Sequence, residues 1–122
     1  MCGIAGFVGF RHLDGEAIIA TAQKMGDAIR HRGPDDSGIW RDDSEQIAFV
    51  HRRLSILDLS PAGHQPMVSA SGRFVIVFNG EIYNHLVLRD ALGSGLRGND
   101  GLGCIVWRGH SDTETLLAGI EA

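Results

Sequence analysis

The chain has 122 residues and a formal net charge of −4, and 43% of its residues are hydrophobic. These values are typical of one soluble globular domain, and the acidic balance gives no support for a nucleic-acid or anionic membrane surface. There is no apolar run near the roughly 18 residues of a membrane-spanning helix, no signal peptide, and too few cysteines for a disulfide framework, so we expect a cytoplasmic protein.

The N-terminal half predicts a strand, a helix and a pair of strands. The apolar run 4–10 indicates the first strand, and Asp14 caps a helix over 16–30 in which apolar residues recur at helical spacing. A Gly-Pro pair at 33–34 ends that helix. Residues 37–41 and 47–51 then predict two strands joined by an acidic turn. The β character continues through Leu54, Ile56 and Leu57.

The C-terminal half predicts a hairpin and two more helices. Residues 67–70 and 73–78 form the hairpin, and the second arm is apolar throughout, which is typical of a strand covered on both faces. A short helix follows over 84–92, then a glycine-rich loop and a strand at 104–107. Ser111 begins the last helix, with Glu114 completing a capping box, and its buried face comprises Leu116, Leu117 and Ile120. The fold class is therefore α/β or α+β, with helices on at least one sheet face.

Cys2 directly follows the initiator methionine, and removal of Met1 would place a thiol and a free α-amine on one residue. The thiolate is a strong nucleophile, and the α-amine has a reference pKa of about 7.7–8.0, so part of it accepts protons near neutral pH. A nucleophile with its own base is a known catalytic arrangement. By position alone, Cys2 also fits a small buried apolar residue.

Asn79-Gly80 follows the most hydrophobic predicted strand and has two interpretations. Asn-Gly is the strongest signal for a tight β-hairpin turn, although 81–85 is a poor second strand. Alternatively, the strand end presents the Asn79 amide and the Gly80 N–H side by side. Two such donors could hold an oxyanion during acyl transfer.

Two charged residues indicate an amino-acid binding site. Arg53, in the pair Arg52-Arg53, either lies on a solvated strand edge or binds a substrate carboxylate through a bidentate contact. Asp112, in the first turn of the last helix, either compensates the helix dipole or binds a substrate ammonium. Together they would recognise both charged groups of a free amino acid.

Other signals for cofactors and metals fail. The segment 93–98 matches the pattern GxGxxG but neither follows a confident strand nor opens a helix, so we reject a dinucleotide site. There is no phosphate-binding P-loop. The 6 histidines have no metal-ligand spacing, and we expect no metal site. A Cys–His hydrolase that uses Cys2 with His31 or His64 stays open at this level.

The sequence resembles the glutaminase domain of class II glutamine amidotransferases, within the N-terminal nucleophile hydrolases. The resemblance is greatest to glutamine-hydrolysing asparagine synthetases and to their relatives that are encoded in bacterial polysaccharide gene clusters. The motifs that carry it span nearly the whole chain, in this order: Met1-Cys2-Gly3-Ile4-Ala5-Gly6, His31-Arg32-Gly33-Pro34-Asp35, Arg53-Leu54-Ser55-Ile56, Asn79-Gly80-Glu81-Ile82-Tyr83-Asn84 and Ser111-Asp112-Thr113-Glu114.

The resemblance implies a role for each motif. Cys2 attacks the side-chain amide of L-glutamine, its α-amine moves the proton, and a thioester is hydrolysed to glutamate with release of ammonia. Asn79 and Gly80 hold the oxyanion. Arg53 would bind the α-carboxylate, and Asp112 with Glu81 would bind the α-ammonium. The wall of the pocket would be the backbone of Leu54, Ser55, Ile56 and Leu57. The loop 31–35 would pack around the nucleophile.

The resemblance also implies a four-layer α/β/β/α sandwich that is incomplete on its C-terminal side. Residues 1–122 would be a partial glutamine amidotransferase domain, without the synthetase domain that binds ATP and Mg²⁺ and passes ammonia to an activated carboxylate. The expected acceptor is aspartate, with a sugar carboxylate as the alternative. The expected partners are L-glutamine and the synthetase domain, and a homodimer is compatible. A second hypothesis is an inactive remnant, or a glutamine-binding module that needs a partner chain.

Overall fold

The structure, a computed structural model, describes residues 1–9, 12–55, 60–95 and 105–122. These residues form a mixed α/β fold with one three-stranded and one two-stranded sheet, both antiparallel. The elements are, in chain order, β1 (Gly3–Val8), α1 (Gly15–Ala28), the 3₁₀-helix η1 (Arg30–Arg32), β2 (Asp36–Asp42), β3 (Ile47–Arg53), the 3₁₀-helix η2 (Pro61–Gly63), β4 (Met67–Val68), β5 (Val75–Ile76), α2 (His85–Gly95) and α3 (Asp112–Glu121).

The three-stranded sheet has the order β1-β3-β2, so β3 is its central strand. The β2–β3 hairpin confirms the predicted strand pair, and the carboxylate of Asp42 closes its turn by accepting the amide hydrogens of Ser44 and Glu45. Gly3 pairs with Arg52 in the β1–β3 register. The residue before β1 and the residue after β3 therefore lie at the same end of the sheet, which brings Cys2 next to Leu54.

Helix α1 covers one face of this sheet and confirms the predicted helix. The Asp14 carboxylate caps it by accepting the amide hydrogen of Ala17 at 2.7 Å. The helix buries Ile18 and Ala22 against Ala48 and Val50 of β3, and together these four residues form the apolar core on this side. Burial of the Ile18 and Val50 side chains contributes roughly 1.5–3 kcal/mol each, and the smaller alanines contribute less, so this contact supports the position of β3.

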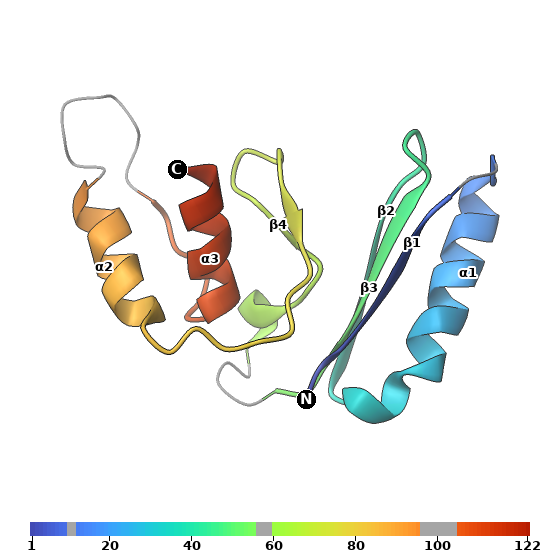
Figure 1. The fold of residues 1–122 in the computed structure, drawn as a ribbon, viewed down its shortest axis with the longest axis horizontal. Helices are drawn as coiled ribbons and strands as arrows, with labels where there is room; N and C mark the ends of the chain where they lie inside the picture. Colours follow the sequence, from blue (N-terminus) through green and yellow to red (C-terminus); the bar gives the residue numbers. More distant parts are fainter. Residues whose placement is uncertain (10–11, 56–59, 96–104) are drawn as a thin grey trace.

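The C-terminal half of the chain lies on the other side of the sheet. In Figure 1, α1 flanks the β1–β3–β2 sheet on one side, while the β4 region and then α3 and α2 follow on the other. Helices α2 and α3 pack against each other. The second half of the chain, which carries the Asn79-Gly80 and Ser111-Asp112 motifs, therefore lies on the side of the sheet opposite α1. No helix in the described ranges combines the length and apolarity needed to cross a membrane.

Two predicted strands differ from the structure. Ile105–Trp107 do not form a strand, and Cys104 lies outside the described residues. This segment is held instead by side chains, because Arg89 stacks over the Trp107 ring at 3.9 Å and the Glu114 carboxylate binds the next backbone amides. In the predicted hairpin only Val75–Ile76 pair with β4, and the apolar arm is half-buried rather than covered on both faces.

The predicted burial of the last helix is partly wrong. Leu117 is buried and Leu116 half-buried, but Ile120 is 53% exposed. The buried residues at the start of the helix are instead polar, from Ser111 through Thr115. Buried polar groups need hydrogen-bond partners, and the first turn has them, as described for the site below.

Gly38 of β2 is required by a close backbone contact. A Cβ atom at Gly38 would lie 2.0 Å from the carbonyl oxygen of Gln65, so Gly38→Ala forces the two segments apart. We expect this change to lower the free energy of unfolding by about 1–3 kcal/mol. Gly93→Ala in α2 is the control, because its Cβ would meet nothing within 4 Å, and better helix propensity should stabilise that variant by about 0.5–1 kcal/mol. Denaturant unfolding measures both, and equal effects would contradict the prediction.

Candidate active site

A cavity of about 360 Å³ lies where the end of the three-stranded sheet meets the start of α3. It is open on one side to solvent and brings together residues from distant parts of the chain. Its lining residues are Met1, Cys2, His51, Arg53, Leu54, Gly63, Gln65, Phe78, Asn79, Gly80, Glu81, Ser111, Asp112 and Thr113. Each motif that contains a predicted catalytic or charged substrate-binding residue thus contributes to one concave surface.

Cys2 is half-buried at the entrance to β1. Its Sγ accepts the amide hydrogen of Leu54 at 3.4 Å, and the thiol lies 3.7 Å from the Leu54 carbonyl oxygen, to which it can donate. The residue is held from behind by the loop after α1, because Gly3 packs against Ile29 and the Arg32 guanidinium donates to the Cys2 carbonyl oxygen at 3.4 Å. The 31–35 loop therefore does lie beside Cys2.

Asn79 and Gly80 line the same cavity as Cys2, and no strand follows them over the next residues. The hairpin interpretation of Asn79-Gly80 is therefore wrong. The Asn79 side-chain amide donates to the Cys2 carbonyl oxygen at 2.9 Å. An amide donor thus contacts the residue that carries the thiol.

The two adjacent arginines point to opposite faces of β3, as side chains alternate along a strand. Arg52 lies on the α1 side, where its Nε donates to the Gly26 carbonyl oxygen at 2.9 Å and it pairs with Asp27 at 2.7 Å. Arg53 lies on the cavity side, 8% exposed, and its Nη1 donates to the Ser60 carbonyl oxygen at 2.9 Å. The backbone of Gly63 packs directly against its guanidinium, since a Cβ there would lie 2.3 Å from Nη2. The alternative of a solvated strand edge is wrong for Arg53.

The carboxylate of Asp112 is fixed at the start of α3. It is 8% exposed, and its two oxygens accept the amide hydrogens of Ile82 and Thr113, each at 2.8 Å. The hydrogen bond from Ile82 connects the segment after Gly80 to α3. Asp112 therefore does more than compensate the helix dipole. Glu81 lies exposed at the cavity rim. Two carboxylates and the Arg53 guanidinium thus line one cavity, and their charges are complementary to the ammonium and carboxylate of a free amino acid.

The predicted pocket wall is only partly described. Leu54 lines the cavity but does not continue the strand, because β3 ends at Arg53. Ser55 is not among the lining residues, and its amide instead donates to the Asp35 carboxylate at 2.8 Å. Ile56 and Leu57 lie outside the described residues. Their expected role in the wall stays a prediction.

His31 and His64, the partners considered for a Cys–His hydrolase, do not line the cavity. His31 is exposed in η1, and His64 pairs with Asp36 through Nδ1 at 2.7 Å. Burial would raise the pKa of Asp36, but the hydrogen bonds from His64 and from the Ser37 amide outweigh it and lower that pKa. Within the described residues, no group of His, Cys, Asp and Glu side chains is arranged to hold a metal ion.

Sequence reasoning missed His51, which is two residues before Arg53 and so lies on the same face of β3. It is 1% exposed, and its Nε2 has no hydrogen-bond partner. Burial lowers the pKa of His51, and the opposite effects of the Phe78 backbone and Asp36 are smaller. The lowered pKa keeps the His51 ring neutral beside Arg53 at neutral pH. The period of two along the strand was the signal that could have found it.

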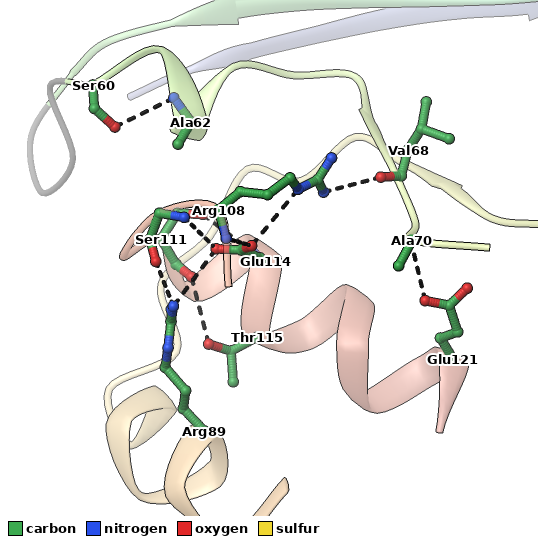
Figure 2. A network of polar contacts seen from close by, with 11 residues as sticks. Ser60, Ala62, Val68, Ala70, Arg89, Arg108, Ser111, Glu114, Thr115 and Glu121 are labelled. Carbon is green, nitrogen blue, oxygen red and sulfur yellow. Dashed lines mark hydrogen bonds and ion pairs between the residues drawn. The ribbon is translucent and has the colours of Figure 1, made fainter. Parts of the chain in front are cut away.

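A buried ionic network supports the start of α3 from behind the cavity (Figure 2). The Glu114 carboxylate, in a side chain 6% exposed, accepts the amide hydrogens of Arg108 at 2.6 Å and Gly109 at 3.0 Å. It also pairs with Arg89 of α2 at 3.8 Å and with the Arg108 guanidinium at 3.7 Å. The predicted Ser111 cap is confirmed, since its hydroxyl accepts the Glu114 amide hydrogen. The carboxylate of Glu114 thereby joins α2, the 105–109 segment and α3.

Comparison with known proteins agrees with this geometry. Residues 1–122 match the family described as glutamine amidotransferase domain. The chain is 44% identical over 90 residues to asparagine synthetase [glutamine-hydrolyzing] 1 of Saccharomyces cerevisiae, which covers 74% of the chain and 15% of that relative. It is 37% identical over 127 residues to asparagine synthetase [glutamine-hydrolyzing] 3 of Bacillus subtilis, covering 96% of the chain and 17% of the relative.

The chain thus spans less than a fifth of the length of these relatives, and the family match over residues 1–122 includes the cavity residues Cys2, Arg53, Asn79 and Asp112. The family match over the whole chain and the cavity that unites its motifs lead to one conclusion: this chain belongs to the glutamine amidotransferase domain family, as it occurs in relatives of the glutamine-hydrolysing asparagine synthetases.

Proposed function

We propose that the chain hydrolyses L-glutamine to glutamate and ammonia with Cys2 as the nucleophile. The observation that supports this most directly is the single cavity that unites a cysteine thiol, an amide donor, a buried arginine and a buried carboxylate. These residues, Cys2, Asn79, Arg53 and Asp112, come from four separate segments. Each supplies one of the groups that this reaction needs.

The charged groups of the cavity complement the two ends of glutamine. The Arg53 guanidinium pairs with the α-carboxylate, for which its planar donors are well suited. Asp112, helped by Glu81, pairs with the α-ammonium. The side-chain amide then extends toward Cys2, along a wall formed by the backbone of Leu54, Ser55, Ile56 and Leu57.

The chemistry is acyl transfer through a thioester. The Cys2 thiolate attacks the side-chain amide carbon, and the resulting oxyanion accepts hydrogen bonds from the Asn79 side chain and the Gly80 N–H. The C–N bond then breaks, and the nitrogen leaves as ammonia with the proton that came from the thiol. A water molecule attacks the thioester, which releases glutamate and restores the thiol.

The α-amine of Cys2 is the proposed carrier of that proton. It becomes free only when Met1 is removed, because in the chain with Met1 the Cys2 nitrogen is an amide. Met1 also lines the cavity, so its removal enlarges the space at the nucleophile. N-terminal sequencing of the purified protein checks this step, and an active protein with Met1 retained would overturn the proposed role of the amine.

The whole protein is proposed to use the ammonia for amidation. A synthetase domain like that of the asparagine synthetases would bind ATP and Mg²⁺ and activate a carboxylate. Aspartate is the proposed acceptor of the ammonia, and a sugar carboxylate is the alternative. The chain itself would need no cofactor or metal.

We also propose a cytoplasmic location, and a homodimer is compatible with the proposal. The proposed fold is a four-layer α/β/β/α sandwich, and the helices on both outer sides in Figure 1 support it.

The direct test is release of glutamate from glutamine by the purified protein, measured with a glutamate dehydrogenase-coupled assay. A glutamine analogue with an electrophilic side chain should add once, to Cys2 and not to Cys104, as peptide mass spectrometry can show. Glutamine binding without glutamate release would instead support the glutamine-binding module. No binding at all would support an inactive remnant and would overturn the proposed function.

Asp112→Asn should raise the KM for glutamine by at least about tenfold, with a smaller effect on kcat. The change leaves the substrate ammonium without its buried anion, and loss of one partner of a buried charge pair costs about 2–5 kcal/mol. Asp90→Asn, on an exposed position of α2 outside the cavity, is the matched control and should keep the wild-type KM. Steady-state kinetics decide, and an unchanged KM in Asp112→Asn would contradict the assigned role.

A further inference from the structure

Gln65 has a side chain that contacts both halves of the candidate active site. It lies between η2 and β4, is 7% exposed and lines the cavity. Its Oε1 accepts the amide hydrogen of Phe78 at 2.6 Å, and its Nε2 donates to the Thr113 hydroxyl at 3.2 Å. Phe78 and Thr113 are 35 positions apart in the sequence. The Gln65 side-chain amide therefore connects the segment after β5 to the start of α3.

The two contacted residues are direct neighbours of the groups assigned to glutamine. Phe78 precedes Asn79-Gly80, which hold the oxyanion, and Thr113 follows Asp112, which binds the ammonium. The Thr113 hydroxyl also lies 3.5 Å from the Asp112 carboxylate. A shift of Gln65 would therefore move the two groups relative to each other.

The backbone around Gln65 is itself fixed to the main sheet. Its carbonyl oxygen packs against Gly38 in β2, where a Cβ would come within 2.0 Å. The preceding residue, His64, pairs with Asp36 at the start of β2. Gln65 therefore connects both active-site segments to β2.

We propose that Gln65 is a positioning residue that sets the spacing between the oxyanion donors, Asn79 and Gly80, and the ammonium-binding carboxylate of Asp112. The inference rests on the proposed function. A bound glutamine must reach Asp112 with its ammonium while its side-chain amide lies between Cys2 and the oxyanion donors. The distance between these two groups thus decides whether the bound substrate is also the reactive one, and displacements near 1 Å can cost about a hundredfold in rate.

Gln65→Met tests this by removing both hydrogen bonds at nearly constant side-chain length. We expect kcat/KM for glutamine to fall by about 10- to 100-fold, with kcat lowered and KM raised, because both ends of the site are released. Thr113→Val breaks only the connection to α3, so it should act mainly on KM. Thr113→Ser keeps the hydroxyl and should restore KM toward the wild-type value.

Two further measurements separate positioning from loss of structure. Circular dichroism establishes that each variant is folded at the assay temperature. The rate of Cys2 alkylation by iodoacetamide, followed by peptide mass spectrometry, should stay within about twofold of wild type in Gln65→Met, since the thiol is hydrogen-bonded to the backbone of Leu54. A variant that loses alkylation and activity in parallel would overturn the inference in favour of a general packing role.

The two proposals fail in different ways. If the wild-type protein releases glutamate and Gln65→Met has the wild-type kcat and KM, the positioning role is wrong and the proposed function stands. If the wild-type protein releases no glutamate, the proposed function is wrong and the positioning role falls with it.

Discussion

Cys2→Ala should abolish glutamate release from glutamine, with a fall in kcat of at least about a thousandfold. The reason is chemical: no other described side chain in the cavity is a thiol, and the proposed thioester cannot form without one. Glutamine binding should persist, because Arg53 and Asp112 are held by Ser60 and Ile82 rather than by Cys2. Steady-state glutamate release and calorimetric binding of glutamine measure the two expectations.

The control for this variant is Cys104→Ala, the other cysteine of the chain. It should keep both glutamate release and the single adduct with an electrophilic glutamine analogue on Cys2. Undiminished release by Cys2→Ala would disprove the thioester mechanism. Loss of binding together with loss of release would instead show that Cys2 shapes the cavity.

Glu114→Ala should produce the largest loss of stability, about 3–5 kcal/mol in the free energy of unfolding. The carboxylate satisfies two backbone amides and two arginines, and its removal leaves Arg89, with a side chain 14% exposed, without its buried anion. Glu114→Gln should lose less, because the amide oxygen still accepts hydrogen bonds from Arg108 and Gly109. Denaturant unfolding followed by circular dichroism measures the series.

The control for Glu114 is Glu45→Ala in the β2–β3 turn, an exposed glutamate. Substitution of such a surface residue should change the free energy of unfolding by no more than about 0.5 kcal/mol. A Glu114→Ala variant as stable as this control would show that the network in Figure 2 contributes nothing net to the fold. Arg108 is 53% exposed and should contribute the smaller share of the loss, owing to solvent screening.

Local sequence signals predicted the elements whose causes are local. The Asp14 cap with helical spacing gave α1, and the acidic turn gave the β2–β3 hairpin. The strand predicted at 104–107 failed over Ile105–Trp107, because Arg89 stacks on the Trp107 ring and Glu114 binds the amides of Arg108 and Gly109, in place of pairing with a neighbouring strand. Short apolar runs do not carry that information.

The residues of the candidate active site also divide into those that the sequence predicted and those that only long-range packing reveals. Motif resemblance identified Cys2, Asn79, Arg53 and Asp112 as candidates, and the structure places all of them in one cavity. It does not place Ser55 among the lining residues, and it adds His51 and Gln65. The contribution of Gln65 depends on which side chains meet it from distant segments, so no spacing in the sequence could reveal it.

The sequence by itself determined the family, the chemistry of the candidate residues and most of the helices and strands, because these depend on residue types and short-range order. Only the tertiary structure decided that Arg53 is buried at the cavity rather than on a solvated strand edge, that Asn79-Gly80 is not a hairpin turn, and that Glu114 and Gln65 connect distant segments around the site. The physical reason is that these outcomes depend on contacts between segments brought together by packing.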